Sequence, residues 1–168
     1  MNLLQIPSEQ PVIIDANILV YANQRVSNQC IKLLEKCSNN EAYGILPVHI
    51  LAEVMHVLML AEAKDLGLVK GANTARQLSE NPRKIKALNR YESLIRDLLA
   101  IGLQLESLQR EDFLTAMHLQ REHGLLTNDA LFLAIALRLR VTSIISADSA
   151  FKNIPGIIQY SPDDLIIE

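Results

Sequence analysis

Residues 125–151 read LLTNDALFLAIALRLRVTSIISADSAF and predict a helix that leads directly into a strand. Asp129 falls in the first turn of this helix, and an apolar run at 130–136 follows it. Residues 141–146 are apolar and β-branched, as in a buried strand of a parallel sheet. Asp148 comes directly after that strand. Ligands bind at the carboxyl ends of strands in open α/β sheets, so both acids are candidates for a functional site.

The rest of the chain repeats this alternation of strand and helix. Four further short apolar segments predict strands at residues 11–14, 43–46, 103–105 and 157–160. Periodic segments predict helices at 18–22, 27–37, 48–64 and 111–123, and a two-helix arm at about 70–100 that is interrupted at Asn81-Pro82. Strands that alternate with helices favour a parallel sheet covered on both faces. The sequence therefore predicts a single α/β domain over residues 1–168, with a mainly parallel sheet of about five strands.

Composition and cysteine content are those of an ordinary globular protein in a reducing compartment. Hydrophobic residues make up 49% and charged residues 21% of the 168 residues, and the net charge is -3. The apolar run at 54–61 is far shorter than a membrane span of about 20 residues. Cys30 and Cys37 lie too far apart on one predicted helix for a disulfide, so we expect free thiols. With no visible signal peptide, the sequence predicts a cytoplasmic protein without membrane contact.

Four acids are expected at one edge of the sheet. Asp15 ends the first predicted strand, Glu53 lies in the helix after the second, and Asp129 and Asp148 flank the strand at 141–146. Each alone has a structural interpretation, as a cap or as a charge at a helix terminus. Together, four carboxylates repel one another and require a cation, and oxygen ligands without cysteine select Mg²⁺ or Mn²⁺. Such a site suits phosphodiester hydrolysis, in which metals orient and deprotonate water and neutralise the phosphate.

The helix at 48–64 carries two histidines that offer a second interpretation. His49 and His56 lie near Glu53 on a helical wheel at about 100° per residue, which offers a His-Glu-His zinc site as the alternative. The spacing is loose and single histidines usually have structural roles, so the oxygen-only site is favoured.

The same residues resemble the PIN-domain nucleases, and most of all the small VapC-type toxin ribonucleases and their stand-alone relatives. Four motifs in order carry the resemblance, namely VIIDANILVYA at 12–22, ILAEVMHVL at 50–58, LLTNDALFLAIAL at 125–137 and SIISADSAF at 143–151. Any one motif is weak, but the four in order at suitable spacing are strongly specific. The resemblance covers about residues 11–160 and implies a PIN-like three-layer α/β/α sandwich.

For the site, the resemblance implies a quartet of catalytic acids that bind Mg²⁺ or Mn²⁺, which are Asp15, Glu53, Asp129 and Asp148. Asn17 matches the polar position of the family after the first Asp, and Ser146 matches its Thr or Ser two residues before the last Asp. Both are expected to orient water or a ligand carboxylate. The implied function is a metal-dependent endoribonuclease that hydrolyses RNA, as a VapC-type toxin with an antitoxin partner.

Two features depart from the family pattern. His49 stands where relatives often carry Ser, and the arm at 70–100 is long for a minimal toxin. These departures leave the quartet intact and make the nuclease assignment firmer than the toxin assignment. The alternatives are a catalytically silent PIN-fold interaction module and a PIN nuclease in RNA processing outside a toxin–antitoxin pair. An aspartyl-phosphate phosphatase would need a second Asp where Asn17 stands.

Positive charge is concentrated in the predicted arm. Residues 70–96 hold seven basic residues and two glutamates, a local charge of +5 that leaves -8 for the rest of the chain. Three interpretations are open for Arg83, Lys84 and Lys86. They form part of a solvated face, or they contact RNA phosphates, or they contact a protein partner. Other candidates for phosphate contact are Arg121, Arg138 and Arg140. Apolar residues are abundant in the arm, at Leu78, Ile85, Leu88, Leu94, Ile95, Leu98 and Leu99. They favour the partner role, with a homodimer as the minimal assembly.

Overall fold

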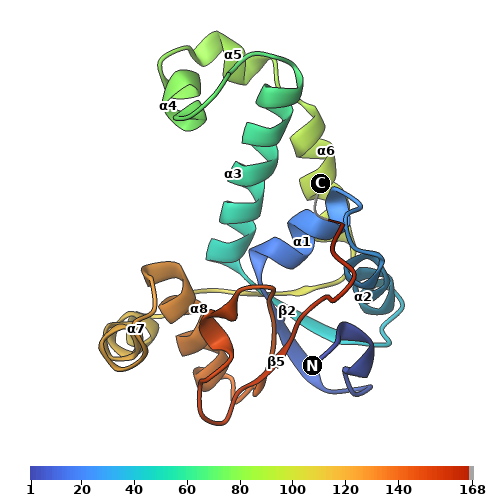
Figure 1. Ribbon diagram of the computed structural model, residues 1–168, viewed down its shortest axis with the longest axis vertical. Helices are drawn as coiled ribbons and strands as arrows, with labels where there is room; N and C mark the ends of the chain where they lie inside the picture. Colours follow the sequence, from blue (N-terminus) through green and yellow to red (C-terminus); the bar gives the residue numbers. More distant parts are fainter. Residues whose placement is uncertain (167–168) are drawn as a thin grey trace.

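A five-stranded parallel sheet runs through the centre of the computed structural model, which describes residues 1–166 (Figure 1). The strands are β1 (Pro11–Ile14), β2 (Tyr43–Pro47), β3 (Gln104–Glu106), β4 (Ser143–Ile145) and β5 (Ile158–Tyr160). Their order is β3-β2-β1-β4-β5, and every neighbouring pair is parallel, which confirms the predicted sheet. In the central strand, Val12, Ile13 and Ile14 are fully buried, as β-branched residues are in a sheet that is covered on both faces.

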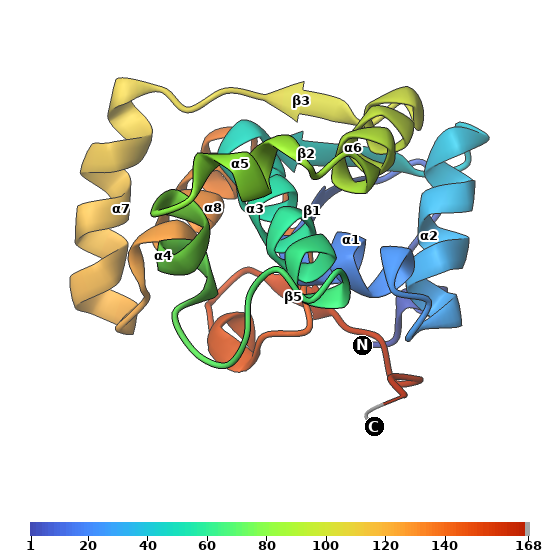
Figure 2. The same ribbon diagram turned by 90° about the horizontal axis from the view of Figure 1, so that it is seen from above.

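Helices cover both faces of this sheet. Outside the arm they are α1 (Ala16–Asn23), α2 (Asn28–Ser38), α3 (Val48–Asp65), α7 (Arg110–His123) and α8 (Thr127–Arg138), with short 3₁₀ turns η1 (Leu3–Gln5) and η2 (Ser149–Phe151). The chain moves outward from β1 to β2 and β3 and then returns to β4, so right-handed crossovers place α7 and α8 on the face opposite α1 and α2. Figures 1 and 2 show this arrangement, which confirms the α/β/α sandwich.

The junction between α8 and β4 differs from the prediction. The structure pairs only residues 143–145 with the neighbouring strands, rather than the predicted 141–146. The reason is that the Val141 N–H donates to the Ala136 carbonyl at 2.9 Å, so Val141 belongs to the helix C-terminus. α8 is buried from Ala130 to Ala136, and its Phe132 ring lies 5.4 Å from the Phe151 ring.

The arm contains three helices, and the prediction of two is wrong. They are α4 (Thr74–Ser79), α5 (Pro82–Lys86) and α6 (Arg90–Ala100). Pro82 begins α5, as the predicted interruption requires. The second interruption comes from a distant residue, because the buried Glu62 carboxylate of α3 accepts the N–H groups of Asn89, Arg90 and Tyr91. Glu62 thereby caps the start of α6 and ties it to α3.

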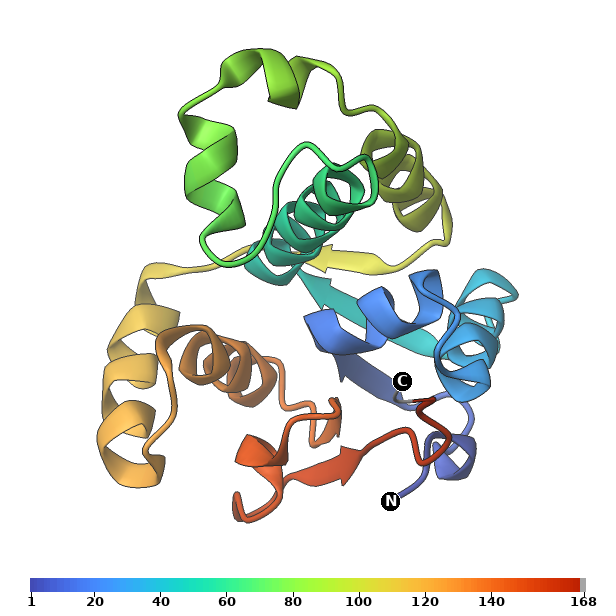
Figure 3. The same cartoon turned by 45° about the horizontal axis from the view of Figure 1, so that its top comes forward.

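The arm buries most of its own apolar side chains. Leu78 and Leu88 pack with Ala63 and Val69 in a small hydrophobic cluster at the end of α3. Further along, α6 packs against α3 and buries its inward side chains in the main core, as Ile95 shows. Figure 3 shows α4 and α5 as a separate loop of helices beyond the sheet. The apolar residues that favoured a partner contact are therefore largely used inside the chain.

Across residues 1–166, the helices are all too short or too polar to cross a membrane.

Candidate functional site

The four predicted acids line one cleft of about 430 Å³ at the carboxyl edge of the sheet. Asp15 directly follows β1, and Asp148 lies just beyond β4. Glu53 comes from α3, and Asp129 comes from the first turn of α8. The parallel topology places the ends of β1 and β4 side by side, and the helices that follow β2 and precede β4 begin at the same edge. Residues far apart in the sequence thus meet in one place.

The Asp15 carboxylate is held by three hydrogen bonds. Its Oδ1 accepts the Ala16 N–H at 2.7 Å, which caps the start of α1. Its Oδ2 accepts the Asn17 amide at 2.8 Å and the Ser146 hydroxyl at 2.6 Å. A carboxylate with this many donors has little freedom to rotate, so its orientation is set before any ligand arrives.

Asn17 and Ser146 also hold the loop that carries Asp148. The Asn17 Oδ1 accepts the Ala147 N–H at 3.1 Å, and the Ser146 Oγ accepts the Asp148 N–H at 3.0 Å. Ser146 is fully buried beneath the cleft, whereas Asn17 lines it. The structure therefore places both predicted supporting residues between Asp15 and Asp148.

Two acids of the cleft, Asp129 and Asp15, have raised pKa values. Burial, together with the carboxylates of Asp148, Asp15 and Glu53, raises the pKa of Asp129 to about 6. Burial also raises the pKa of Asp15, where hydrogen bonds from Ser146, Ala16 and Asn17 oppose the rise and the Glu53 charge adds to it. A bound cation would offset this repulsion.

The donor set fits a hard divalent cation in its chemistry, because it consists of carboxylate oxygens. The side chains line the cleft without converging: in residues 1–166, no three Asp, Glu, His or Cys side chains stand close enough to hold one metal ion. Glu53 has its own partner in the cleft, because the Asn128 amide donates to Glu53 Oε2 at 2.9 Å. Asn128 also lines the cleft, and the sequence did not predict this role, because a polar residue at the start of a helix is usual for capping.

The zinc interpretation of the α3 histidines is not supported. The His49 ring nitrogens are buried and have no hydrogen-bond partner, and burial lowers the pKa of this histidine. His56 is exposed, and neither histidine lines the cleft. Among the described residues, no metal-binding group includes them.

The candidate phosphate contacts occupy different environments. Arg138 is not available, because its guanidinium donates to Asp112 Oδ1 and to Glu106 Oε1, each at 2.8 Å, and to Asp112 Oδ2 at 3.0 Å. The prediction that Arg138 contacts phosphate is therefore wrong. The sequence did not indicate that the buried Asp112 would pair with it. Arg121 and Arg140 are exposed.

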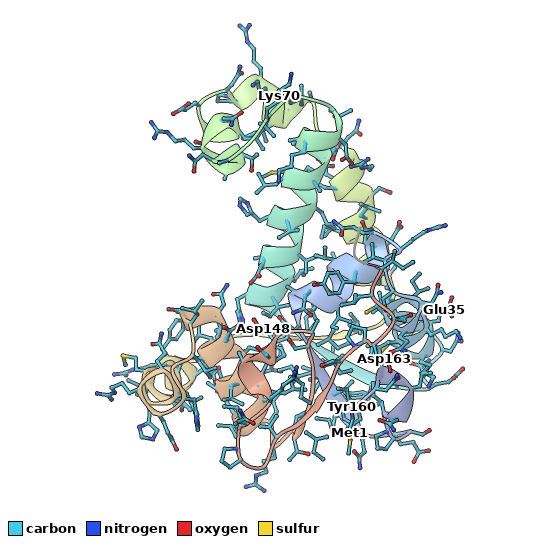
Figure 4. All side chains as sticks on the ribbon, viewed as in Figure 1. Met1, Glu35, Lys70, Asp148, Tyr160 and Asp163 are labelled. Carbon is cyan, nitrogen blue, oxygen red and sulfur yellow. The ribbon has the colours of Figure 1, made fainter. Side chains whose placement is uncertain are left out.

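The three predicted contacts of the arm all lie on α5, well away from the cleft. Arg83 and Lys86 are exposed, whereas the Lys84 Nζ donates to the Leu68 carbonyl at 2.6 Å. Lys84 thus has a structural contact inside the arm. Figure 4 places Lys70 in the arm and Asp148 at the cleft, at opposite ends of α3.

Comparison with known proteins agrees with this architecture. The chain is similar in structure to a toxin–antitoxin complex from Klebsiella pneumoniae, with a TM-score of 0.54 and 16% identity over 88% of this chain and 95% of that chain. It is also similar to VapBC2 from Rickettsia felis bound to a DNA fragment from their promoter, with a TM-score of 0.56 and 18% identity over 92% of this chain and 100% of that chain. At these identities the likeness shows a shared fold.

The sequence matches a family model but no individual curated protein. Curated protein sequences contain no significant match. The PIN domain model matches residues 12–157, a range that begins in β1 and contains the four acids of the cleft. The chain therefore belongs to the PIN domain family.

Proposed function

We propose that the chain is a metal-dependent endoribonuclease that hydrolyses RNA phosphodiester bonds. The observation that carries the proposal is the meeting of four carboxylates, from four separate elements, in one cleft. A scaffold that only binds other proteins has no need of clustered acids, in which burial and neighbouring carboxylates raise the pKa of Asp129. The residues that would hold Mg²⁺ or Mn²⁺ are Asp15, Glu53, Asp129 and Asp148.

The residues around that site have different roles. A bound Mg²⁺ or Mn²⁺ supplies Lewis-acid chemistry, because it lowers the pKa of water and offsets charge on the phosphate. Asp15 is oriented in advance by Ser146 and Asn17, so little rearrangement is needed when ligands bind. The Asn128 amide of α8 donates to Glu53 and orients its carboxylate. Together these contacts orient two of the four acids, Asp15 and Glu53, before a ligand binds.

Cleavage of RNA by the purified chain tests the proposal. Structured and unstructured RNAs are incubated with Mn²⁺, with Mg²⁺ or with EDTA, and the cut sites are mapped. We expect metal-dependent cleavage by the wild type and none by Asp129→Asn. The matched control is Asp97→Asn, which removes an exposed acid from α6, outside the cleft. Loss of cleavage in both variants, or in neither, would contradict the proposal.

The catalytically silent PIN-fold module remains the second candidate. The observation in its favour is that no three potential ligands in residues 1–166 stand close enough to hold a metal ion. Calorimetric titration of the wild type and Asp129→Asn with Mn²⁺ separates the two candidates. The nuclease requires binding that Asp129→Asn weakens, whereas the silent module predicts no difference between them.

We further propose that the chain acts as the toxin of a toxin–antitoxin pair, assembled as a homodimer with an antitoxin protein. Support comes from the shared fold with the two toxin–antitoxin complexes. Induced expression of the wild type should arrest growth of a bacterial host, and Asp129→Asn should not. Equal growth of the two strains, at equal amounts of protein, would favour a PIN nuclease with a role in RNA processing.

A further inference from the structure

The cations of the arm fall into two groups. Four of the seven have partners in the arm, in α3 or in the turn after α3, namely Arg76 with Glu80, Arg90 with Asp65, Arg96 with Glu92 and Lys84 with the Leu68 carbonyl. The other three are Lys70, Arg83 and Lys86, which are exposed and, within residues 1–166, have no side-chain hydrogen bond or ion pair. We call these three residues the arm cations. They are positive charges that the fold itself does not use.

The sequence alone favoured a protein partner for the arm because of its apolar residues, but the folded arm uses these side chains internally. Leu78 and Leu88 are buried in the arm's own cluster, and Ile85 packs against it. The core of a protein interface is apolar and depleted of charged residues, whereas the one large apolar side chain of α5, Ile85, packs against the cluster inside the arm. α5 offers two exposed cations in its five residues and buries none of its side chains fully. A surface of this kind suits the phosphates of a nucleic acid.

The arm and the cleft lie at opposite ends of α3. Glu53 and Asp65 are twelve residues apart on α3, so about 18 Å separates the cleft from the arm end of this helix. Figures 1 and 2 show α4 on the same side of α3 as α8, which carries Asp129 into the cleft. Because α5 lies beyond this end of α3 (Figure 1), the separation is a lower limit, and at about 3.4 Å of rise per phosphate in one stacked strand it corresponds to at least about five phosphates.

We propose that the arm cations bind the backbone of the RNA strand on one side of the phosphate that is cleaved. The chain then acts preferentially on RNAs long enough to reach both the cleft and the arm. The proposal rests on the RNA-cleaving function above, and it adds a second contact region and a minimum substrate length of about six nucleotides. It gives Arg83 and Lys86 a role in substrate binding and none in the bond-breaking step.

The expected effect follows from counterion release. Each phosphate contact with a single strand contributes about 0.7 to the slope of log affinity against log salt. Loss of two contacts should therefore reduce the slope by about 1.4, and at about 0.15 M salt it should weaken binding roughly tenfold.

The test compares two matched double variants. Arg83→Gln with Lys86→Gln removes two arm cations, and Lys32→Gln with Lys36→Gln removes two lysines from α2, on the other side of the strands from α8. Glutamine is chosen because it keeps helix propensity close to that of Lys and Arg. Each variant, with the wild type, is assayed on an RNA of about 20 nucleotides and on one of about four nucleotides that contains the same cut site. Binding of the longer RNA is measured at several salt concentrations in EDTA.

We expect the arm variant to raise the KM of the longer RNA about tenfold, with kcat and the short RNA unchanged. The α2 variant should match the wild type on both RNAs. Equal effects of the two variants, or equal effects on the two RNAs, would overturn the proposal. Unchanged RNA kinetics with weaker self-association of the arm variant in sedimentation would assign the arm to a second copy of the chain instead.

The outcomes also separate this proposal from the proposed function. If the wild type and the arm variant cleave both RNAs equally well, the proposed nuclease function is supported and the arm contact is contradicted. If the longer RNA binds in a way that depends on the arm but no RNA is cleaved, the arm contact is supported and the nuclease function is contradicted. Absence of both binding and cleavage overturns both.

Discussion

Ser146 and Asp15 are 131 residues apart in the chain, yet the Ser146 hydroxyl donates a 2.6 Å hydrogen bond to Asp15 Oδ2. The bond joins the ends of the neighbouring strands β4 and β1 beneath the cleft. The same hydroxyl oxygen accepts the Asp148 N–H. One buried side chain therefore sets the relation between two of the four acids.

Ser146→Ala should destabilise the fold and reduce cleavage. Removal of the hydroxyl leaves the Asp148 N–H without its acceptor and removes one of the three donors to Asp15, at a cost of about 1–3 kcal/mol. Urea unfolding and RNA cleavage measure the two effects. Ser146→Thr, which keeps the hydroxyl, should recover activity. The control Ser149→Ala changes an exposed serine of η2 and should have little effect. A Ser146→Ala variant as active as the wild type would remove the positioning role.

Asp129→Asn should stabilise the metal-free protein while it abolishes cleavage. Burial and three neighbouring carboxylates raise the pKa of Asp129 from 3.8 to about 6, so the charged form is unfavourable in the folded state. At 1.36 kcal/mol per pKa unit this rise sets an upper limit of about 3 kcal/mol. Solvent screening at this half-exposed carboxyl reduces the expected gain to about 1 kcal/mol. Urea unfolding in EDTA measures it, and a less stable variant would mean that Asp129 has a structural contact.

The stability of the metal-free protein should depend on pH through Asp129. Its pKa is about 6 in the folded protein and lower when unfolded, so between pH of about 4 and 6 the folded state binds the extra proton. Stability should therefore fall as pH rises through this window and level off above it. Thermal melts in EDTA at several pH values measure the slope, and Asp129→Asn should flatten it. An unchanged slope in the variant would assign the titration to another group.

Other acids set the opposite trend at lower pH. Burial raises the pKa of Glu62 and Asp112, but hydrogen bonds to their carboxylates outweigh it and lower both. Their contribution is complete above the unfolded pKa of about 4 and is lost as pH falls through the folded values. The metal-free protein should thus be most stable near the lower end of the Asp129 window.

Mg²⁺ or Mn²⁺ should raise the Tm of the wild type. A cation that binds the folded cleft and not the unfolded chain stabilises by about 2.7 kcal/mol at a concentration of 100 times Kd. Asp129→Asn should show a smaller shift, and EDTA should abolish cleavage. Activity that survives exhaustive chelation would contradict the metal mechanism.

Arg138→Ala should be among the most destabilising substitutions on the surface of α8. The variant leaves the buried Asp112 carboxylate without its cation, which costs about 3–5 kcal/mol. Urea unfolding measures the loss. Arg121→Ala, which removes an exposed arginine of α7, is the control and should change stability by less than about 0.5 kcal/mol. Equal stability of the two variants would show that the Arg138 pair contributes little.

The sequence by itself determined the α/β architecture and the set of acids. Strands such as Pro11–Ile14 are encoded in local patterns, because burial on both faces of the sheet selects apolar residues, as at Val12, Ile13 and Ile14. The helix Val48–Asp65 is encoded by its apolar residues, and the folded chain buries one stripe of it, at residues such as Ile50, Val54 and Leu58. The acids at the ends of these segments could be named for the same reason: in a parallel sheet, strand ends share one edge.

Only the tertiary structure decided which partners these residues have. The hydrogen bond from Asn128 to Glu53 spans 75 residues, and the Arg138 bond to Asp112 spans 26. The second break in the arm depends on Glu62, which is 27 residues away from Asn89. A local pattern records whether a side chain is buried or polar, whereas a hydrogen bond depends on angles and distances between atoms that only the folded chain brings together.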